Sequence, residues 1–309
     1  MNENRIADLA PSGRATTLEG LRSLLGLMDS PEGLGKGLGI SLRPTDTVIA
    51  PYGKSGTTWL QQIAHTLRTR GDMDFDDISR VAPWIEQSVS LGLDLDAEQK
   101  ANPRIFKSHL DAHRIPAGGR YINSCREPSD ALYSMYRFME GWFLEPGTVS
   151  LDDFARATFL RAGNEPDSAG GDYWTHLASW WARRNDPDVL FLAYEHIKRD
   201  LRGTIRKVAA FMDIPLDDEL LAITEEHASL DFMLHHKDRF DDKLMRERSA
   251  EVAGVPADSD SSKVRSGQVG ESRQQLGADV VAELDSIWRK RITRELGFEN
   301  YAAMIAELE

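Results

Sequence analysis

The segment Thr47–Leu60, TVIAPYGKSGTTWL, constrains the fold of this chain more than any other. It begins with a short apolar run that is typical of a buried strand. Gly53 and Gly56 then indicate a tight turn, because glycine takes positive φ at little steric cost. Apolar residues recur at helical spacing afterwards and predict a helix from about Thr57. Free N–H groups and the helix dipole would meet at one point, so the segment predicts a phosphate-binding loop.

The lysine of this loop is not in a Walker A arrangement. That motif needs a glycine, four further residues and then Gly-Lys-Ser/Thr. Gly53-Lys54-Ser55 supplies the end of the motif, but Val48 occupies the position of its first glycine. An ordinary ATP site is therefore disfavoured. The alternative to an anion site is a surface turn with a solvated lysine, and the coincidence of glycines, lysine and hydroxyls favours the anion site.

The overall composition limits the classes of partner. The chain has 309 residues, enough for one α/β domain or two smaller ones. Its net charge of −13 argues against a general binder of nucleic acid or of anionic membranes, so an anionic ligand needs a local basic pocket. Cys125 is the single cysteine, which excludes an internal disulfide and fits a reducing compartment. No apolar run approaches the ~18 residues of a membrane span, and the charged N-terminus lacks a signal-peptide core. We therefore expect a cytoplasmic protein with no integral membrane segment.

Further strands are predicted after the loop. One centres on Ile105 and Phe106, and strand alternation places Lys107 and His109 on one face at its end. Residues 119–125 form the next strand, and residues 189–194 read as a fully buried central strand. Helical patterns lie between these strands, which predicts an α/β fold with a central parallel β-sheet flanked by helices. Ligands of such sheets gather at the carboxyl ends of the strands.

Arg126 and Ser134 are expected on the same rim of this sheet. Arg126 ends a predicted strand, and Pro128 then starts a helix with Ser129 or Asp130 as its N-cap. Ser134 lies on the second turn of that helix. The alternatives are a surface salt bridge for Arg126 and a solvated helix position for Ser134.

The flanking segments are less informative. An amphipathic helix is predicted around residues 21–28, and the glycines between 33 and 39 predict a flexible connector, so about 1–43 form an N-terminal helix and loop extension. Residues 173–181 form an aromatic helix face that favours the core. Residues 237–263 are highly charged, and about 235–270 are expected to form a mobile lid loop. We expect one domain over residues 1–309.

Three motifs near the predicted site follow a known pattern. Tyr52–Trp59 matches Tyr-Pro-Lys-Ser-Gly-Thr-Thr-Trp, with glycine in place of the proline. Lys107–Leu110 matches a Lys-x-His-Leu strand end. Arg126 and Ser134 match an arginine that is followed eight residues later by a serine, across an Arg-x-Pro-x-Asp turn.

Two further motifs extend the pattern along the chain. Tyr194-Glu195 matches a strand that ends in Tyr-Glu, and Arg265-Ser266-Gly267 matches an Arg-Lys-Gly loop that is followed by a further glycine, here Gly270. In this order, from about residue 44 to 295, the five motifs resemble those of the cytosolic-type sulfotransferases. These enzymes use 3′-phosphoadenosine 5′-phosphosulfate (PAPS).

The resemblance implies a P-loop-NTPase-like three-layer sandwich that transfers a sulfuryl group from PAPS to a hydroxyl of a small-molecule or lipid-like acceptor. His109 would be the general base, and Lys54 and Lys107 would stabilise developing charge. No metal is required, because a sulfuryl group carries less charge than a phosphoryl group. The implied cofactor-binding residues are Lys54, Ser55, Gly56, Thr57 and Thr58 at the phosphosulfate, Trp59 and Tyr194 at the adenine, and Arg126, Ser134, Arg265, Ser266 and Gly267 at the 3′-phosphate.

The chain departs from the family pattern in places. Residues 228–230, Ala-Ser-Leu, match the Thr-Ser-Phe segment beside the adenine only loosely, and Ser266 replaces the lysine of the late loop. The Lys-x-x-x-Thr-Val dimerisation motif is not evident, which leaves a monomer or a homodimer. The acceptor pocket is expected near Trp84, residues 142–143 and the 235–262 segment, with a core position as the alternative for Trp84.

Two other functions remain open from the sequence. A P-loop kinase would need Mg²⁺ and an aspartate to hold it, and no predicted strand ends in an obvious candidate. A module that binds a 3′-phosphoadenosine nucleotide without turnover is the second alternative. The presence of both Lys107 and His109 disfavours this module, because binding alone does not need a base.

Overall fold

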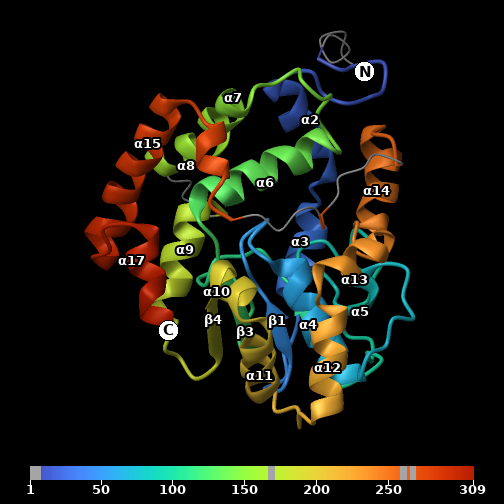
Figure 1. Ribbon diagram of the computed structural model, residues 1–309. Coiled ribbons are helices and arrows are strands. Elements are labelled where there is room, and N and C mark those ends of the chain that lie inside the picture. The colour runs from blue at the N-terminus through green and yellow to red at the C-terminus, as the bar shows by residue number, and fades with distance from the viewer. Residues whose placement is uncertain (1–7, 166–170, 258–262, 265–268) are drawn as a thin grey trace.

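The computed structural model describes residues 8–165, 171–257, 263–264 and 269–309. Within them, four parallel strands form one sheet in the order β2-β1-β3-β4 (Figure 1). Their bounds are Thr47–Ile49 for β1, Ile105–Lys107 for β2, Arg120–Cys125 for β3 and Val189–Ala193 for β4. Helices cover both faces of this sheet (Figure 1), which confirms the predicted α/β fold class.

One face of the sheet packs against three helices. These are α4 (Thr57–Thr69), α11 (Leu201–Phe211) and α12 (Asp218–His227). Ile49, Ile122 and Leu192 point to this side and join the helix residues in one buried cluster. Successive side chains of a strand alternate between faces, so the neighbouring residues of each strand belong to the opposite side. The predicted helix from Thr57 is thereby confirmed.

The opposite face carries the larger core. Val48, Phe106, Tyr121 and Phe191 point into it from the four strands. The helices of this side include α2 (Leu18–Met28), α6 (Pro128–Glu140), α9 (Tyr173–Ala182), α15 (Ala278–Trp288) and α17 (Tyr301–Ile305). The tryptophans of α9 are buried, which confirms the core position predicted for residues 173–181.

The remaining elements are short and lie mostly in the connections. They are α3 (Pro31–Leu38), α5 (Ile78–Val81), α7 (Leu151–Ala155), α8 (Arg161–Asn164), α10 (Tyr194–Arg199), α13 (Leu230–His235), α14 (Lys243–Ala253) and α16 (Arg294–Leu296), with the π-helical η1 (Arg156–Leu160) and η4 (Arg289–Thr293) and the 3₁₀ turns η2 (Lys237–Arg239), η3 (Ser272–Gln275) and η5 (Ala306–Leu308). Among the described residues, no helix combines the length and the apolar character needed to cross a bilayer.

The position of β4 corrects one prediction. Residues 189–194 were expected to form a central strand, but β4 is the last strand in the sheet order of the described residues. Its apolar run reflects burial by helices, because the Phe191 ring packs 5.5 Å from the ring of Trp181 in α9. A continuous apolar run therefore indicates that both faces of a strand are buried, but it does not indicate the position of the strand in the sheet.

The glycine-rich segment after α2 is also different from the prediction. It forms α3, and no flexible connector separates the two helices. The Ser30 hydroxyl caps α3 by accepting from the N–H of Gly33 at 3.1 Å, and Pro31 occupies the first turn. A Cβ at Gly37 would lie 2.1 Å from the carbonyl oxygen of Ile85, so glycine is needed there for close packing. These glycines permit contact and do not break the helix.

Two other local predictions need correction. The carboxylate of Glu127 caps α6 by accepting from the N–H of Asp130 at 3.0 Å, where Ser129 or Asp130 was expected to be the cap. The segment expected as a lid loop contains α14, so the loop assignment is wrong for residues 243–253. Residues 258–262 and 265–268 of that segment lie outside the described residues.

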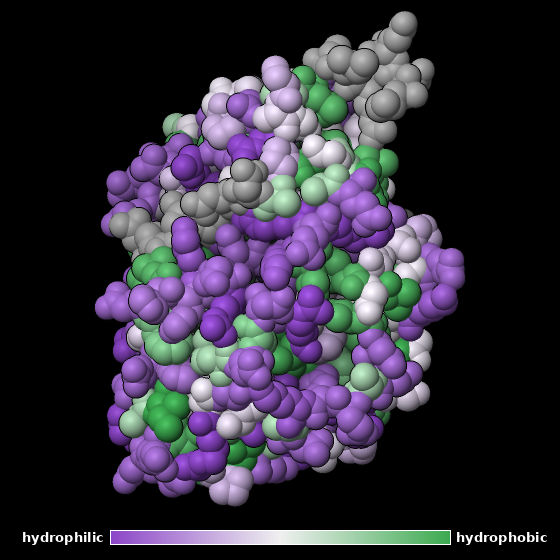
Figure 2. Space-filling model, turned by 90° about the vertical axis from the view of Figure 1, so that its right-hand side faces the viewer, coloured by the Kyte–Doolittle hydropathy of each residue, from purple (hydrophilic) through white to green (hydrophobic). Residues whose placement is uncertain are grey.

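The exterior is mixed in character. Figure 2 shows hydrophobic areas separated by hydrophilic atoms on the face that carries α14 and α12. Among the described residues, the large hydrophobic side chains that are exposed are Leu34, Leu38, Val89, Leu230 and Leu234. Most apolar side chains therefore lie in the two cores or in the cavity described next.

Candidate active site

A cavity of about 530 Å³ opens at the carboxyl ends of β1, β2 and β3. β1 leads to α4 beside it, β2 lies on one side of β1, and β3 lies on the other. The chain thus places strands on both sides of β1, which makes the carboxyl end of β1 a topological switch point. Open α/β sheets bind ligands at such a point. The predicted site residues that line the cavity are Lys54, Gly56, Thr57, Thr58, Trp59, Lys107, His109, Arg126, Ser134 and Tyr194.

The loop between β1 and α4 is built for a close approach of backbone to a ligand. Gly56 has a φ of 100°, and Lys54 also lies in the left-handed region with a φ of 68°. A Cβ at Gly56 would lie 3.1 Å from the Tyr194 ring, so this position has neither the conformation nor the space for a side chain. No side chain caps the N-terminus of α4. The first N–H groups of a thirteen-residue helix therefore face the cavity without a side-chain cap.

Two buried hydroxyls support the assignment of this loop to an anion. Ser55 Oγ and Thr57 Oγ1 are buried and have no hydrogen-bond partner among the described residues. An orphaned buried hydroxyl costs about 1–3 kcal/mol relative to a hydrogen-bonded one. Ser55 itself does not line the cavity, and its carbonyl accepts a hydrogen bond from Ser124 Oγ at 2.5 Å. Among the described residues, no acceptor satisfies these two hydroxyls, and that of Thr57 belongs to a residue that lines the cavity.

Lys54 and Lys107 both line the cavity beside this loop. The Lys54 ammonium is 4.4 Å from the centre of the Phe138 ring, and the Lys107 ammonium is 3.8 Å from the centre of the Trp84 ring. Burial and the positive charge of Lys263 lower the pKa of Lys54 to about 7 and that of Lys107 to about 8. Enclosed cations that are this poorly compensated favour an anionic ligand between them.

His109 is held as a neutral base. Its Nδ1 lies 2.7 Å from the carbonyl oxygen of Pro51, which can only accept, so Nδ1 carries the proton and Nε2 keeps a lone pair. The backbone N–H of His109 donates to Glu86 Oε1 at 2.7 Å, and the Trp84 ring stands edge-on at 5.2 Å. Burial and the charge of Lys107 hold the pKa of His109 well below 6.5.

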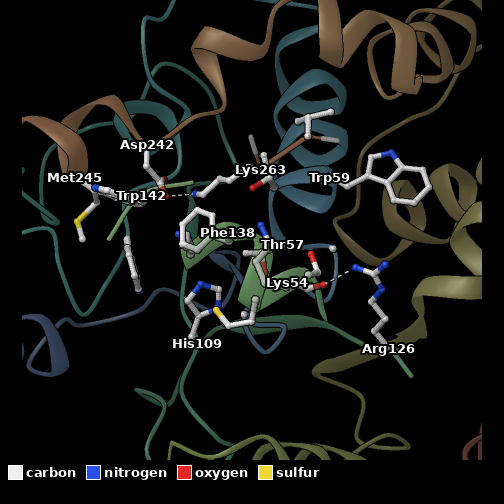
Figure 3. Close-up of a pocket in the computed structure, with 18 of the residues that line it drawn as sticks. Lys54, Thr57, Trp59, His109, Arg126, Phe138, Trp142, Asp242, Met245 and Lys263 are labelled. Carbon is white, nitrogen blue, oxygen red and sulfur yellow. Dashed lines mark hydrogen bonds and ion pairs between the residues drawn. The ribbon is translucent and has the colours of Figure 1, made fainter. Parts of the chain in front are cut away.

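The residues expected at the nucleotide lie together at one end of the cavity. Trp59 and Arg126 stand on the same side of Lys54 in Figure 3, away from His109. The Trp59 and Tyr194 rings are 5.6 Å apart, and the Arg126 guanidinium lies 4.4 Å above the Tyr194 ring. Trp59 Nε1 donates to the carbonyl of Ala228 at 2.7 Å, which ties residues 228–230 to this end. Arg265, Ser266 and Gly267, also expected here, lie outside the described residues.

The other end of the cavity is apolar. Thioether and aromatic side chains from three helices line it, and its wall includes Leu25, Met28, Met135, Phe138, Met139, Trp142, Phe143 and Met245. Trp84 also lines the cavity, as one of its two interpretations predicted, and it packs against the larger core as well. The wall from α2 and the wall from α14 contact each other. The expected contributions of residues 142–143 and of the 235–262 segment are therefore confirmed for the cavity lining.

Three side chains of this site were not among the predicted site residues, although Lys263 begins a basic, glycine-containing stretch that could close over a ligand. Glu86 anchors the backbone of His109, and Asp242 and Lys263 form an ion pair inside the cavity (Figure 3). Glu86 and Asp242 lie in segments without a recognisable motif, and Lys263 lies two residues before the Arg265-Ser266-Gly267 motif, where its positive charge was the available signal. No group of three or more His, Cys, Asp or Glu side chains that could hold a metal ion occurs among the described residues.

Comparison with known proteins identifies relatives of most of the chain. The model of the sulfotransferase domain matches residues 44–296. The rabbit (Oryctolagus cuniculus) protein sulfotransferase 1C2 is 28% identical over 261 residues, which cover 81% of this chain and 84% of the relative. Human (Homo sapiens) sulfotransferase 1E1 is 32% identical over 202 residues, which cover 62% of this chain and 67% of the relative.

Solved structures show the same fold. A retinol dehydratase in complex with androsterone and the inactive cofactor PAP superposes with a TM-score of 0.68 at 20% identity, covering 92% of this chain and 95% of that one. A mouse sulfotransferase complexed with PAP superposes with a TM-score of 0.63 at 23% identity, covering 87% of this chain and 92% of that one. The arrangement of helices around the parallel sheet is therefore shared.

Proposed function

The chain belongs to the sulfotransferase-domain family, and we propose that it transfers a sulfuryl group from PAPS to a hydroxyl of a small apolar acceptor. The observation that carries this proposal is a neutral histidine beside an anion-binding loop. His109 presents a lone pair on Nε2, and Ser55 and Thr57 have buried hydroxyls without partners among the described residues. A base and an anion site in one cavity fit group transfer from an anionic donor to a hydroxyl.

The residues present fit the nucleotide of PAPS. Arg126 and Ser134 would hold the 3′-phosphate, and Trp59 and Tyr194 would contact the adenine, because all four line the cavity and the Arg126 guanidinium lies over the Tyr194 ring beside Trp59. Residues 55–58 would receive the 5′-phosphate with their N–H groups and hydroxyls. Arg265, Ser266 and Gly267 would complete the 3′-phosphate site. When bound, PAPS supplies the activated sulfuryl group.

His109 would take the proton of the acceptor hydroxyl. The hydrogen bond from Nδ1 to Pro51 fixes the ring and the tautomer, so Nε2 is the atom that accepts. A low pKa keeps this nitrogen unprotonated at neutral pH. The negative charge of a bound phosphosulfate beside the ring would raise that pKa and strengthen the base at the moment it is needed.

Lys54 and Lys107 would stabilise the charge that develops during transfer. Lys54 belongs to the loop that would hold the 5′-phosphate, so its ammonium would donate to the oxygen that bridges phosphorus and sulfur. Lys107 and His109 both line the cavity at the end of β2, so the Lys107 ammonium would donate to the sulfuryl oxygens. Both donors are fixed before reaction, and such preorganised donors make a large contribution to catalysis.

The acceptor would bind at the end of the cavity lined by methionine and aromatic side chains. Thioethers adapt to irregular apolar shapes, so this end suits a ring system or a lipid-like chain that carries one hydroxyl. We further propose that residues 1–309 act as one domain in the cytoplasm, as a monomer or a homodimer. The single buried thiol supports a reducing compartment.

Calorimetric titration with PAP, the product nucleotide, tests this function directly. We expect the purified protein to bind PAP and not ATP–Mg²⁺, because the site offers a 3′-phosphate position and its described residues include no group of three or more metal-ligating side chains. Binding of ATP–Mg²⁺ alone would favour a kinase. Binding of PAP, combined with no sulfuryl transfer to any phenol, sterol or aliphatic alcohol supplied, would favour the module that binds the nucleotide without turnover.

The affinity for PAP should fall as the pH rises from 7 to 9. Lys54 and Lys107 have pKa values of about 7 and about 8, so their ammonium groups lose protons in this range, and a neutral amine no longer attracts an anion. The phosphates of PAP are already ionised there, because the second pKa of a phosphomonoester is about 6. Each group that deprotonates weakens binding by at most about tenfold per pH unit above its pKa.

Calorimetry at constant ionic strength measures this pH dependence. Lys54→Arg is the matched control, because its guanidinium stays protonated and should make the decline shallower. A wild-type affinity that does not change between pH 7 and pH 9 would show that neither lysine titrates in the empty site.

A further inference from the structure

Asp242 stands at the start of α14 but does not cap it. An aspartate at this position usually accepts a hydrogen bond from the first turn. Here Asp77 Oδ2 accepts from the N–H of Leu244 at 2.8 Å, and the Asp242 side chain makes no cap hydrogen bond. Asp242 also has a φ of 54°, an uncommon conformation for a residue with a side chain. Its carboxylate points into the cavity and forms an ion pair with Lys263 (Figure 3).

Lys263 is held in the cavity by two consecutive acidic residues. Its ammonium pairs with Asp242, and its backbone N–H donates to Asp241 Oδ1 at 3.1 Å. The side chains of Lys263 and Asp242 are only 9% and 4% exposed. Lysine side chains usually extend so that the ammonium reaches water. Here Asp241 holds the backbone of Lys263 and Asp242 holds its ammonium inside the cavity.

Lys263 lines the same cavity as the predicted catalytic residues. Its positive charge is close enough to lower the pKa of Lys54, of Lys107 and of His109. Burial opposes ionisation of Asp242, but the three lysines together lower its pKa to about 2. Asp242 therefore stands among three buried lysine side chains, and Glu86, Asp77 and Asp241 add negative charge close to them. The cluster of three lysines suits a ligand in which a phosphate and a sulfate each carry a negative charge.

We propose that Lys263 is a further substrate-binding residue that donates to the sulfuryl group of PAPS, and that Asp242 positions its ammonium. The inference rests on the proposed function, because it assigns Lys263 to one part of the same ligand. The ion pair with Asp242 leaves the ammonium with donors to spare, since a lysine has three N–H groups. Lys54, Lys107 and Lys263 then surround the group that is transferred.

The comparison of PAPS with PAP isolates this contact, because PAP lacks the sulfuryl group. We expect Lys263→Met to weaken PAPS binding by about 10–100-fold, the range of a hydrogen bond to a charged group, and to change PAP affinity by less than about threefold. Calorimetry without an acceptor measures both. Retained PAP binding shows that the variant folds. Wild-type protein that binds neither nucleotide would overturn the proposed function, whereas an unchanged PAPS affinity in Lys263→Met would overturn only this inference.

Lys243→Met is the matched control. Lys243 pairs with Asp76 at 2.8 Å on the surface, next to Asp242 in sequence, and its loss should leave both affinities within about twofold. If Lys263→Met weakens PAPS and PAP equally, the lysine contacts the nucleotide and the assignment to the sulfuryl group is wrong.

A double-mutant cycle tests the role of Asp242. Asp242→Asn keeps the shape of the side chain and removes its charge, so we expect a selective loss of PAPS affinity smaller than that of Lys263→Met. If Asp242 acts through Lys263, the double variant should bind PAPS no more weakly than Lys263→Met alone. Additive losses would show that Asp242 acts independently and would remove its positioning role.

Discussion

His109→Ala is expected to lower the rate of sulfuryl transfer by about 10²–10⁴, the usual contribution of a general base. The affinity for PAP should change little, because the imidazole faces the acceptor side and not the nucleotide end of the cavity (Figure 3). The hydrogen bond to Pro51 leaves Nε2 as the only ring nitrogen free to accept a proton. Turnover with a phenolic probe such as 2-naphthol, measured beside PAP calorimetry, separates the two effects.

His113→Ala is the matched control for this experiment. His113 is exposed four residues further along the chain and does not line the cavity, so its loss should leave the rate unchanged. A His109→Ala protein that loses PAP affinity as strongly as it loses turnover would show that the ring supports the nucleotide site, and the assignment as base would have to be withdrawn.

Lys54→Ala should lower both turnover and nucleotide affinity. Loss of one preorganised donor to a developing charge costs about 10²–10³ in kcat. Loss of a charged hydrogen bond to the 5′-phosphate costs a further 1.5–3 kcal/mol in binding. The Lys54 ammonium is enclosed next to Phe138. Water therefore compensates for its loss less well than for the loss of a lysine on the surface. Steady-state kinetics and PAP titration measure the two losses.

Lys290→Ala is the control for Lys54→Ala. Lys290 is exposed and makes one long hydrogen bond of 3.4 Å to Asn164, so its removal changes the net charge equally without touching the cavity. Similar losses in both variants would mean that the effect comes from the overall charge of the protein. A selective loss in Lys54→Ala supports a contact with the ligand.

The loop and its flanking elements follow from local sequence alone. Glycine at a φ of 100° and an apolar period that changes from strand to helix are properties of a few neighbouring residues. The strands around residues 105–107 and 120–125 could be predicted for the same reason. So could the presence of Arg126 and Ser134 in the lining of one cavity, because one follows a strand end and the other lies on the next helix.

Two of the failed predictions concern contacts between distant segments. The glycines of α3 looked flexible because the carbonyl of Ile85, which needs the space beside Gly37, is nearly fifty positions away. The apolar run of β4 indicated burial but not its place at the end of the described sheet. Local propensity carries no information about which partner a surface will meet.

The sequence by itself determined the glycine turn between β1 and α4, the order of the four strands along the chain, and the presence of a histidine and two lysines near the strand ends. Only the tertiary structure decided that Asp242 and Lys263 join them, that Glu86 anchors His109, and that α2 and α14 close the apolar end. The physical reason is the distance along the chain over which each property is decided. Backbone conformation depends on neighbours in sequence, whereas the protonation and position of a buried charge depend on every group that surrounds it in space.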